Sequence, residues 1–265
     1  MKNIDSRAYV DPAAKIADNV TIDAFAFIDA NVEIGEGCHI HPYACIRSGA
    51  RLGKNNEIFE NAVIAATPQD FRWKGEESYV IIGHNNKIRE QVIINRGSRK
   101  ESATKIGSDS FIMAQTHIGH DTEIGDRCVL GNAVKIAGDV KIGSRTILSS
   151  NSLVHEKCHV GDWVLIKGGC RVNGHVPPFT VMAHNPISYF GVNAFILKIG
   201  KKSDEIIEDI AKCYRHVYQT GTSVFNALRR IREDVEESEE RNAIIGFIED
   251  HDLILAAVPL LDAED

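Results

Sequence analysis

The sequence lacks a long apolar run, since no stretch approaches the roughly 20 apolar residues that a transmembrane helix needs. Residues 1–7 also lack the continuous apolar segment of a secretory signal. Positive charge is not in excess either: the net charge is −7, so bulk electrostatics gives no reason for binding to nucleic acid. We therefore expect a cytoplasmic protein that neither inserts into membranes nor binds nucleic acid.

Cysteines at metal-binding spacing are missing as well. The chain contains six cysteines but no Cys-x-x-Cys pair, and the separation of Cys38 from Cys45 is not a recognisable zinc spacing. We expect these cysteines to be reduced and structural, which agrees with a cytoplasmic location.

The sequence is rich, by contrast, in a period of six residues. Every sixth residue is aliphatic over residues 10–64, again over 82–94 and again over 106–172, which makes twenty-five positions on one period. This period fits neither the 3.6 residues of a helical turn nor the two-residue repeat of a single strand. It favours short strands joined by tight turns, and glycine often follows the aliphatic residue, as in Ile34-Gly35 and Ile124-Gly125. Three hexads would close a triangular coil, and the coils would stack with parallel strands about 4.8 Å apart.

This pattern resembles the hexapeptide-repeat family, whose members form a left-handed parallel β-helix. The resemblance implies the left hand, which opposes the usual right-handed preference of crossover connections. It also implies small side chains four positions after the aliphatic residue, which is where Cys38, Cys128, Cys158 and Cys170 stand.

Two segments, residues 65–79 and 95–104, interrupt the repeat. The first contains Gln69, Asp70, Phe71 and Arg72, which combine hydrogen-bonding groups with an aromatic ring. Loops on a rigid scaffold often carry binding residues, so we expect a role in binding, although surface insertions without a role remain an alternative.

After Val172 the repeat ends, and Pro177-Pro178 marks the exit from the coils. Helical patterns follow, with caps predicted at Ser203 and Ser223, a helix end at Gly221 and a third apolar run over residues 243–255. We expect a β-helix domain over residues 1–188 and a small α-helical domain over residues 189–265.

Residues 115–122 carry the most reactive group of side chains, His117, His120 and Asp121. In a coil of eighteen residues, His120 stacks on Gly138 and then on Glu156 at one edge of the prism. A base beside an unobstructed amide is what acyl transfer needs, because one group removes the acceptor's proton and the other stabilises the oxyanion. We expect Asp121, which is adjacent in sequence, or another group to hold the tautomer of the imidazole.

Three interpretations of the histidines are open at this point. They can be structural, they can act in general-base catalysis, or they can bind a metal as in carbonic anhydrases built on the same fold. His84, His117 and His120 do not show the spacing of the carbonic-anhydrase family. We favour the general base, and we expect no metal and no other cofactor.

A more specific resemblance covers essentially the whole chain. The chain resembles the bacterial acyl-[acyl-carrier-protein]–UDP-N-acetylglucosamine O-acyltransferases, which catalyse the first step of lipid A biosynthesis. The segments that carry it are residues 69–70, 88–90, 95–97, 117–121, 136–138, 154–155, 168–170, 176–178 and 190–193, followed by the helical tail.

This resemblance implies that the enzyme transfers a 3-hydroxyacyl chain from acyl carrier protein to the glucosamine 3-hydroxyl of UDP-N-acetylglucosamine. It also implies a homotrimer with the site between subunits, and we expect the Gln69-Asp70 loop to face His120 of an adjacent subunit. The catalytic residues would be His120, Asp121 and Gly138. The residues that would bind substrate are Gln69, Asp70, Arg72, His117, Asp139, His155, Glu156, Gly168 and Asn193.

The chain departs from the family pattern at four places. Asp139 stands where histidine is usual, Arg72 where lysine is usual, and Glu156-Lys157 where Gln-Phe is usual. Residues 198–202 lack a pair of arginines. The base and oxyanion elements are retained while the nucleotide-binding residues differ. An acyltransferase for another nucleotide sugar or for acyl-coenzyme A therefore remains an alternative, as does a catalytically inactive binding protein.

Overall fold

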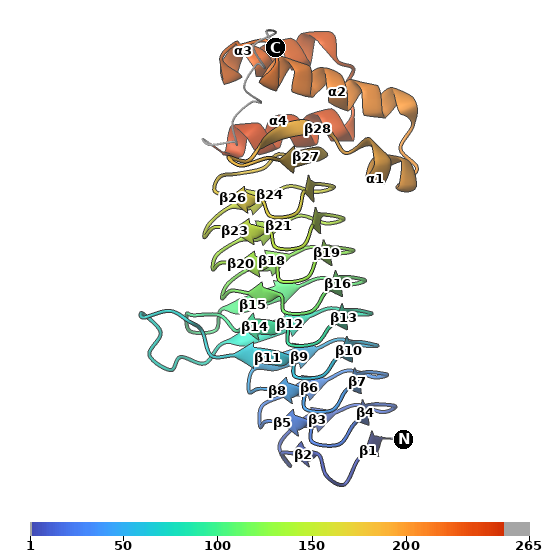
Figure 1. Ribbon diagram of the computed structural model, residues 1–265, viewed down its shortest axis with the longest axis vertical. Coiled ribbons are helices and arrows are strands. Elements are labelled where there is room, and N and C mark those ends of the chain that lie inside the picture. The colour runs from blue at the N-terminus through green and yellow to red at the C-terminus, as the bar shows by residue number, and fades with distance from the viewer. Residues whose placement is uncertain (1, 252–265) are drawn as a thin grey trace.

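The computed structural model describes residues 2–251, in which a long stack of triangular coils carries a group of helices at its C-terminal end (Figure 1). Three sheets form the walls of the stack, and successive strands pass from one sheet to the next. The first sheet, A, contains β1 (Asn3–Ile4), β4 (Thr21–Ile22), β7 (His39–Ile40), β10 (Glu57–Ile58), β13 (Lys87–Ile88), β16 (Phe111–Ile112), β19 (Val129–Leu130), β22 (Ile147–Leu148), β25 (Leu165–Ile166), β27 (Thr180–Ala183) and β28 (Ser188–Val192).

Sheets B and C complete the triangle. Sheet B contains β2 (Tyr9–Val10), β5 (Phe27–Ile28), β8 (Cys45–Ile46), β11 (Val63–Ala66), β14 (Ile93–Asn95), β17 (His117–Ile118), β20 (Lys135–Ile136), β23 (Leu153–Val154) and β26 (Arg171–Val172). Sheet C contains β3 (Lys15–Ile16), β6 (Glu33–Ile34), β9 (Ala50–Leu52), β12 (Tyr79–Ile82), β15 (Ala103–Ile106), β18 (Glu123–Ile124), β21 (Lys141–Ile142) and β24 (His159–Val160).

The aliphatic period of six fills the interior of this prism. Uninterrupted coils pair residues eighteen apart, as Ile118 pairs with Ile136, and both of these side chains are fully buried. A fully buried isoleucine contributes about 1.5–3 kcal/mol, so a column of them on each wall stabilises the stack. The residue before each aliphatic one points outward, which places side chains such as His117 and Lys135 on the outer face of a wall.

The glycines that follow the aliphatic residues were expected to form tight turns, but the structure shows a different role for them. The left-handed backbone at the corners is carried mainly by other residues, for example Asn31 with φ 53° and Asp121 with φ 57°. Gly35 instead allows close approach of the coils, because a Cβ there would lie 2.5 Å from the carbonyl oxygen of Gly53.

Both interruptions of the repeat are loops that leave the coils in register. The first and last residues of each predicted interruption belong to neighbouring strands, so the loops themselves are residues 67–78 and 96–102. Ile64 pairs with Ile94 across the first loop, and Ile82 pairs with Ile106 across the second. Main-chain hydrogen bonds join the two loops, such as Glu101 N–H to the carbonyl of Glu77 at 2.8 Å, and Figure 1 shows both on the same side of the stack.

The C-terminal part begins with a hairpin that the sequence did not predict. Strand β27 continues sheet A beside β25, and β28 pairs with β27 in the antiparallel direction. The helices are α1 (Ala194–Ile199), α2 (Asp204–Tyr218), α3 (Val224–Asp234) and α4 (Glu239–Asp250). The buried Tyr214 of α2 donates its hydroxyl hydrogen bond to the carbonyl of Pro178, which fastens the helices to the last coil.

The predicted helix caps are confirmed. Ser203 accepts a hydrogen bond from the Ile206 N–H, and Ser223 accepts one from the Asn226 N–H. Helix α2 ends at Tyr218, before the predicted stop at Gly221, and α4 begins at Glu239 rather than at residue 243. Residues 252–255 of the third predicted run lie outside the described residues. The expected domain boundary falls at the start of β28, and the division into two domains stays a prediction.

The cysteines are free thiols, and Cys38, Cys128, Cys158 and Cys170 are buried as expected. Burial raises the pKa of the Cys128 thiol to about 11, so it is an unreactive packing residue. Among the described residues, no helix combines the length and the apolar character needed to cross a membrane.

Candidate active site

His117, His120 and Asp121 lie on and directly after strand β17. The buried Ile118 anchors this strand in the core, so His117 faces outward from sheet B. His120 and Asp121 form the corner between sheets B and C, where Asp121 adopts a left-handed conformation. The sharp corner presents both side chains on the outside of one edge of the prism.

The imidazole of His120 lies between two carboxylates. Its Nδ1–H donates to Asp121 Oδ2 at 2.9 Å, and its Nε2 lies 3.6 Å from Asp70 Oδ2. The side chain is 13% exposed, so it is mostly covered. With a carboxylate accepting at Nδ1, the neutral ring leaves Nε2 as the nitrogen that can take a proton.

Asp121 is held by the second loop. The main-chain N–H and the hydroxyl of Ser98 donate to its Oδ2 at 2.9 and 2.7 Å, and the Arg99 guanidinium lies 3.3 Å from Oδ1. Burial on its own raises the pKa of Asp121. Hydrogen bonds from Ser102, Ser98 and His120 together outweigh this effect and lower the pKa to about 2. Asp121 is therefore ionised at neutral pH and can stabilise a protonated His120.

This pKa predicts a pH dependence of stability. Because the pKa of Asp121 is lower in the folded protein than its ordinary value of 3.8, its contribution is fully present above about pH 4 and is lost as the pH falls through about 2. Wild type should lose roughly 1 kcal/mol more than Asp121→Asn between pH 5 and pH 3. Urea unfolding at both pH values measures this difference, and equal losses in the two proteins would contradict it.

Gly138 stacks on His120, as the coil length predicts. A Cβ at residue 138 would lie 2.5 Å from both Cε1 and Nε2 of the imidazole, so only glycine leaves room for the ring. The next residue continues the stacking, because the Asp139 N–H donates to the His120 carbonyl at 2.9 Å. Within residues 2–251, the Gly138 N–H donates to no main-chain oxygen.

The first loop brings Asp70 against His120 of the same chain. Asp70 thus reaches from the loop after β11 to the corner after β17, two strands further along sheet B. The expectation that residues of this loop or its neighbours face His120 of an adjacent subunit stays a prediction. Arg72 donates to the Asp70 carboxylate through its main-chain N–H, Nε and Nη2, at 2.8, 3.1 and 2.7 Å. These bonds hold the pKa of Asp70 well below its usual range, so it is an anion. Gln69, next to it, is exposed.

Two arginines offset the acidic residues that depart from the family pattern. Arg99 donates through Nη2 to Asp139 Oδ1 at 2.8 Å and so bridges Asp139 and Asp121. The pKa of Arg72 is raised chiefly by Asp70, and also by Asp139 and Glu156. Ser98 and Arg99 were not singled out from the sequence, because the second loop has no register from which their positions could be read.

A hollow of about 390 Å³ lies on sheet B beside His117. Its wall includes His155 and Glu156 from the predicted site, together with the basic residues Lys135 and Arg171. Arg171 Nε donates to His155 Nε2 at 2.7 Å, while burial lowers the pKa of His117, helped by Lys135 and His120. Lys135 and Arg171 were missed from the sequence. Both stand in the same outward column as His117: Lys135 is one coil of eighteen residues away, and Arg171 is three coils away.

Gly168 and Asn193 do not join this group within one chain. Gly168 lies at the corner between sheets A and B. Asn193 is 2% exposed and donates through Nδ2 to the carbonyl of Trp163 at 2.8 Å, at the corner between sheets C and A. Their part in substrate binding stays a prediction that requires a second copy of the chain.

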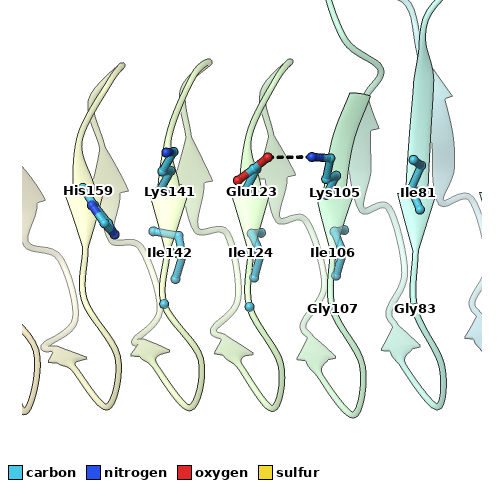
Figure 2. Close-up of a pocket in the computed structure, with 12 residues that line it drawn as sticks. Ile81, Gly83, Lys105, Ile106, Gly107, Glu123, Ile124, Lys141, Ile142 and His159 are labelled. Carbon is cyan, nitrogen blue, oxygen red and sulfur yellow. Dashed lines mark hydrogen bonds and ion pairs between the residues drawn. The ribbon is translucent and has the colours of Figure 1, made fainter. Parts of the chain in front are cut away.

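A second hollow, of about 490 Å³, runs along the outer face of sheet C (Figure 2). Lys105, Glu123, Lys141 and His159 follow one another along it, and Lys105 pairs with Glu123 at 2.8 Å. It contains none of the predicted site residues and is an open groove between exposed side chains. Among the predicted site residues, those at the edge between sheets B and C and in the hollow on sheet B lie close together, and this is the candidate site.

Comparison with known proteins shows the family. The family model for bacterial transferase hexapeptide repeats matches residues 13–48, 31–66 and 103–138, which defines the class as hexapeptide-repeat transferases. A second model, UDP-N-acetylglucosamine O-acyltransferase domain 2, matches residues 175–253. An acyl-[acyl-carrier-protein]–UDP-N-acetylglucosamine O-acyltransferase of Syntrophobacter fumaroxidans is 37% identical over 92% of this chain and 96% of its own. One from Aliarcobacter butzleri is 38% identical over 87% of this chain and 89% of its own.

Solved structures show the same relationship. A UDP-N-acetylglucosamine acyltransferase from Bacteroides fragilis superposes with a TM-score of 0.92 at 41% identity, covering 96% of this chain and 99% of that one. The corresponding enzyme of Francisella novicida gives a TM-score of 0.92 at 35% identity, over 97% and 95% of the two chains. The chain belongs to the family of acyl-[acyl-carrier-protein]–UDP-N-acetylglucosamine O-acyltransferases. The predicted family and the predicted left-handed β-helix with a small helical tail are both confirmed.

Proposed function

We propose that this chain transfers an (R)-3-hydroxyacyl group from acyl carrier protein to the glucosamine 3-hydroxyl of UDP-N-acetylglucosamine. The observation that carries this proposal is the position of His120, hydrogen-bonded to the ionised Asp121 and stacked on Gly138. The names of the relatives supply the two substrates.

In the proposed reaction, Nε2 of His120 takes the proton of the 3-hydroxyl as its oxygen attacks the thioester carbonyl carbon. The carbonyl oxygen becomes an oxyanion, which the Gly138 N–H stabilises. The carbon–sulfur bond then breaks, and the protonated His120 returns its proton to the departing thiolate. While His120 carries this proton, the carboxylate of Asp121 stabilises the imidazolium, as the carboxylate of a catalytic His-Asp pair does. No metal or cofactor enters these steps.

The hollow on sheet B is the proposed place for the nucleotide sugar. Lys135 and Arg171 line it and can balance the diphosphate, which compensates in part for the missing arginine pair in residues 198–202. Glu156 stands at its edge and favours hydrogen-bond donors on the ligand. This position beside His117 keeps the sugar within reach of His120, which follows His117 by three residues.

A donor and acceptor comparison tests the proposed function. Purified protein is assayed with 3-hydroxyacyl carrier protein and with the matching acyl-coenzyme A, each with UDP-N-acetylglucosamine and with other nucleotide sugars. We expect turnover with the carrier-protein donor and UDP-N-acetylglucosamine. A preference for acyl-coenzyme A would overturn the proposed donor, and a preference for another nucleotide sugar would overturn the proposed acceptor. No turnover with any combination of donor and acceptor would favour a binding protein.

The proposal includes a homotrimer and a cytoplasmic location. Free thiols at all six cysteines support a reducing compartment. A trimer is what the resemblance to the family implies, and it is the arrangement in which Gly168 and Asn193 of one copy could lie near His120 of another. Sedimentation equilibrium at micromolar concentration should give three times the monomer mass, and a monomer would contradict this prediction.

A further inference from the structure

A second group of chemically active side chains lies on sheet A, between the N-terminus and the first loop. Asp23 follows β4, while His39 and His41 lie on and just after β7, so the three come from two neighbouring coils. Asp23 and His41 occupy equivalent positions eighteen residues apart. This group takes no part in the active site, which lies at another edge of the prism.

The ligand atoms of these three side chains converge. His39 Nε2 lies 2.7 Å from Asp23 Oδ2, and His41 Nδ1 lies 4.0 Å from the same oxygen. All three atoms lie within 4.8 Å of one another, and in residues 2–251 they are the one such group of three histidine, cysteine or acidic side chains. Two ligands of a tetrahedral zinc ion are about 3.4 Å apart when each bond is about 2.1 Å, which lies between the two distances observed here. The stacked rings of His39 and His41 must rotate out of their stack for both nitrogens to face one ion.

The surroundings orient His41 as metal sites require. Glu57, on the next coil, accepts from His41 Nε2–H at 3.2 Å, which leaves Nδ1 as the nitrogen with a free lone pair. A carboxylate behind a ligating histidine is a common feature of metal sites, because it fixes the ring and makes it more basic. The ring is also packed between His39 and Phe59, at centroid distances of 3.9 and 4.5 Å.

A fourth ligand, a carboxylate oxygen, is available as well. Glu60 Oε1 lies 4.0 Å from His41 Nδ1, which is the same nitrogen that faces Asp23. The side chains of Asp23, His39 and Glu60 are 34%, 38% and 42% exposed, so an ion can enter from solvent. Two imidazoles with carboxylate oxygens suit zinc and its neighbours in the first transition series.

We propose that Asp23, His39 and His41 bind a divalent transition-metal ion of the zinc type, with Glu60 or water completing the coordination. The ion joins two neighbouring coils outside the core, and Glu57 adds a third coil through its hydrogen bond. Its effect is on the stability of the N-terminal coils, and it takes no part in acyl transfer.

Titration of Zn²⁺ into metal-free protein, followed by calorimetry, tests this site. We expect wild type to bind one ion per chain that His39→Asn and Asp23→Asn do not bind. Glu57→Gln keeps the three ligands but loses the charge behind His41, so its affinity should fall about 10–100-fold. His184→Asn removes an exposed histidine far along the chain and should bind as wild type does.

A thermal unfolding series gives a second readout. Zn²⁺ should raise the unfolding temperature of wild type and of His184→Asn, and this rise should disappear in His39→Asn. Circular dichroism without metal confirms that each variant is folded. The proposal is overturned if His39→Asn and Asp23→Asn bind the same number of ions as wild type with the same affinity.

Discussion

Replacing His120 by alanine should lower kcat for acyl transfer roughly 10²–10⁴-fold, the usual contribution of a positioned general base. The expected loss follows from the position of Nε2, which is the ring nitrogen not engaged with Asp121. The fold should remain, because the side chain lies at a corner outside the aliphatic core. Loss of its hydrogen bond to Asp121 should cost about 1–2 kcal/mol of stability.

The assay compares His120→Ala with wild type at saturating donor and acceptor, after the same oligomeric state has been verified for both. His184→Ala is the control, since it removes an exposed histidine on the hairpin side of the molecule. Wild-type turnover in His120→Ala would show that the general-base assignment is wrong. A fall in kcat at all pH values, with a melting temperature lowered by only a few degrees, is the expected result.

Gly138→Ala should lower kcat by about 100-fold although it removes neither catalytic side chain. The new methyl group would lie 2.5 Å from Cε1 and Nε2 of His120, so the imidazole must shift by about 1 Å, and misplacement of that size can cost about that factor in rate. The same methyl also crowds the amide that faces the developing oxyanion.

Gly246→Ala is the matched control, because it adds the same methyl group in helix α4 with nothing within 4 Å. It should keep full activity and gain about 0.5–1 kcal/mol of stability, as alanine does in a helix interior. If Gly138→Ala retained wild-type kcat, the stacking of residue 138 on the imidazole would have no catalytic meaning. Binding of substrates should change less than turnover in this variant.

The coils could be predicted from the sequence because a fixed number of residues per turn converts sequence distance into spatial distance. That rule placed Gly138 beside His120, and both the contact and the register are as expected. The same rule would have found Lys135 and Arg171 if it had been applied to His117. Periodic segments therefore carried both the fold and the central part of the candidate site.

The remaining parts lie where no period exists. Ser98 and Arg99, which hold Asp121 and Asp139, come from a loop whose path depends on contacts with the first loop. The position of Asp70 against its own chain also follows from that path. The hairpin of β27 and β28 was missed because β27 is placed by its pairing with β25 of the last coils, outside the period of six, and β28 then pairs with β27.

The two loops leave the pairing of Ile64 with Ile94 and of Ile82 with Ile106 undisturbed, and this separates two kinds of evolutionary change. Substitutions in the aliphatic columns alter every neighbouring coil and are constrained by packing. Changes of length or composition in residues 67–78 and 96–102 leave the coils in register, but they alter the contacts of Asp70 with His120 and of Ser98 with Asp121. Because main-chain hydrogen bonds join the two loops, a relative with a new acceptor is expected to differ in both loops together, while the coils that carry His120 are retained.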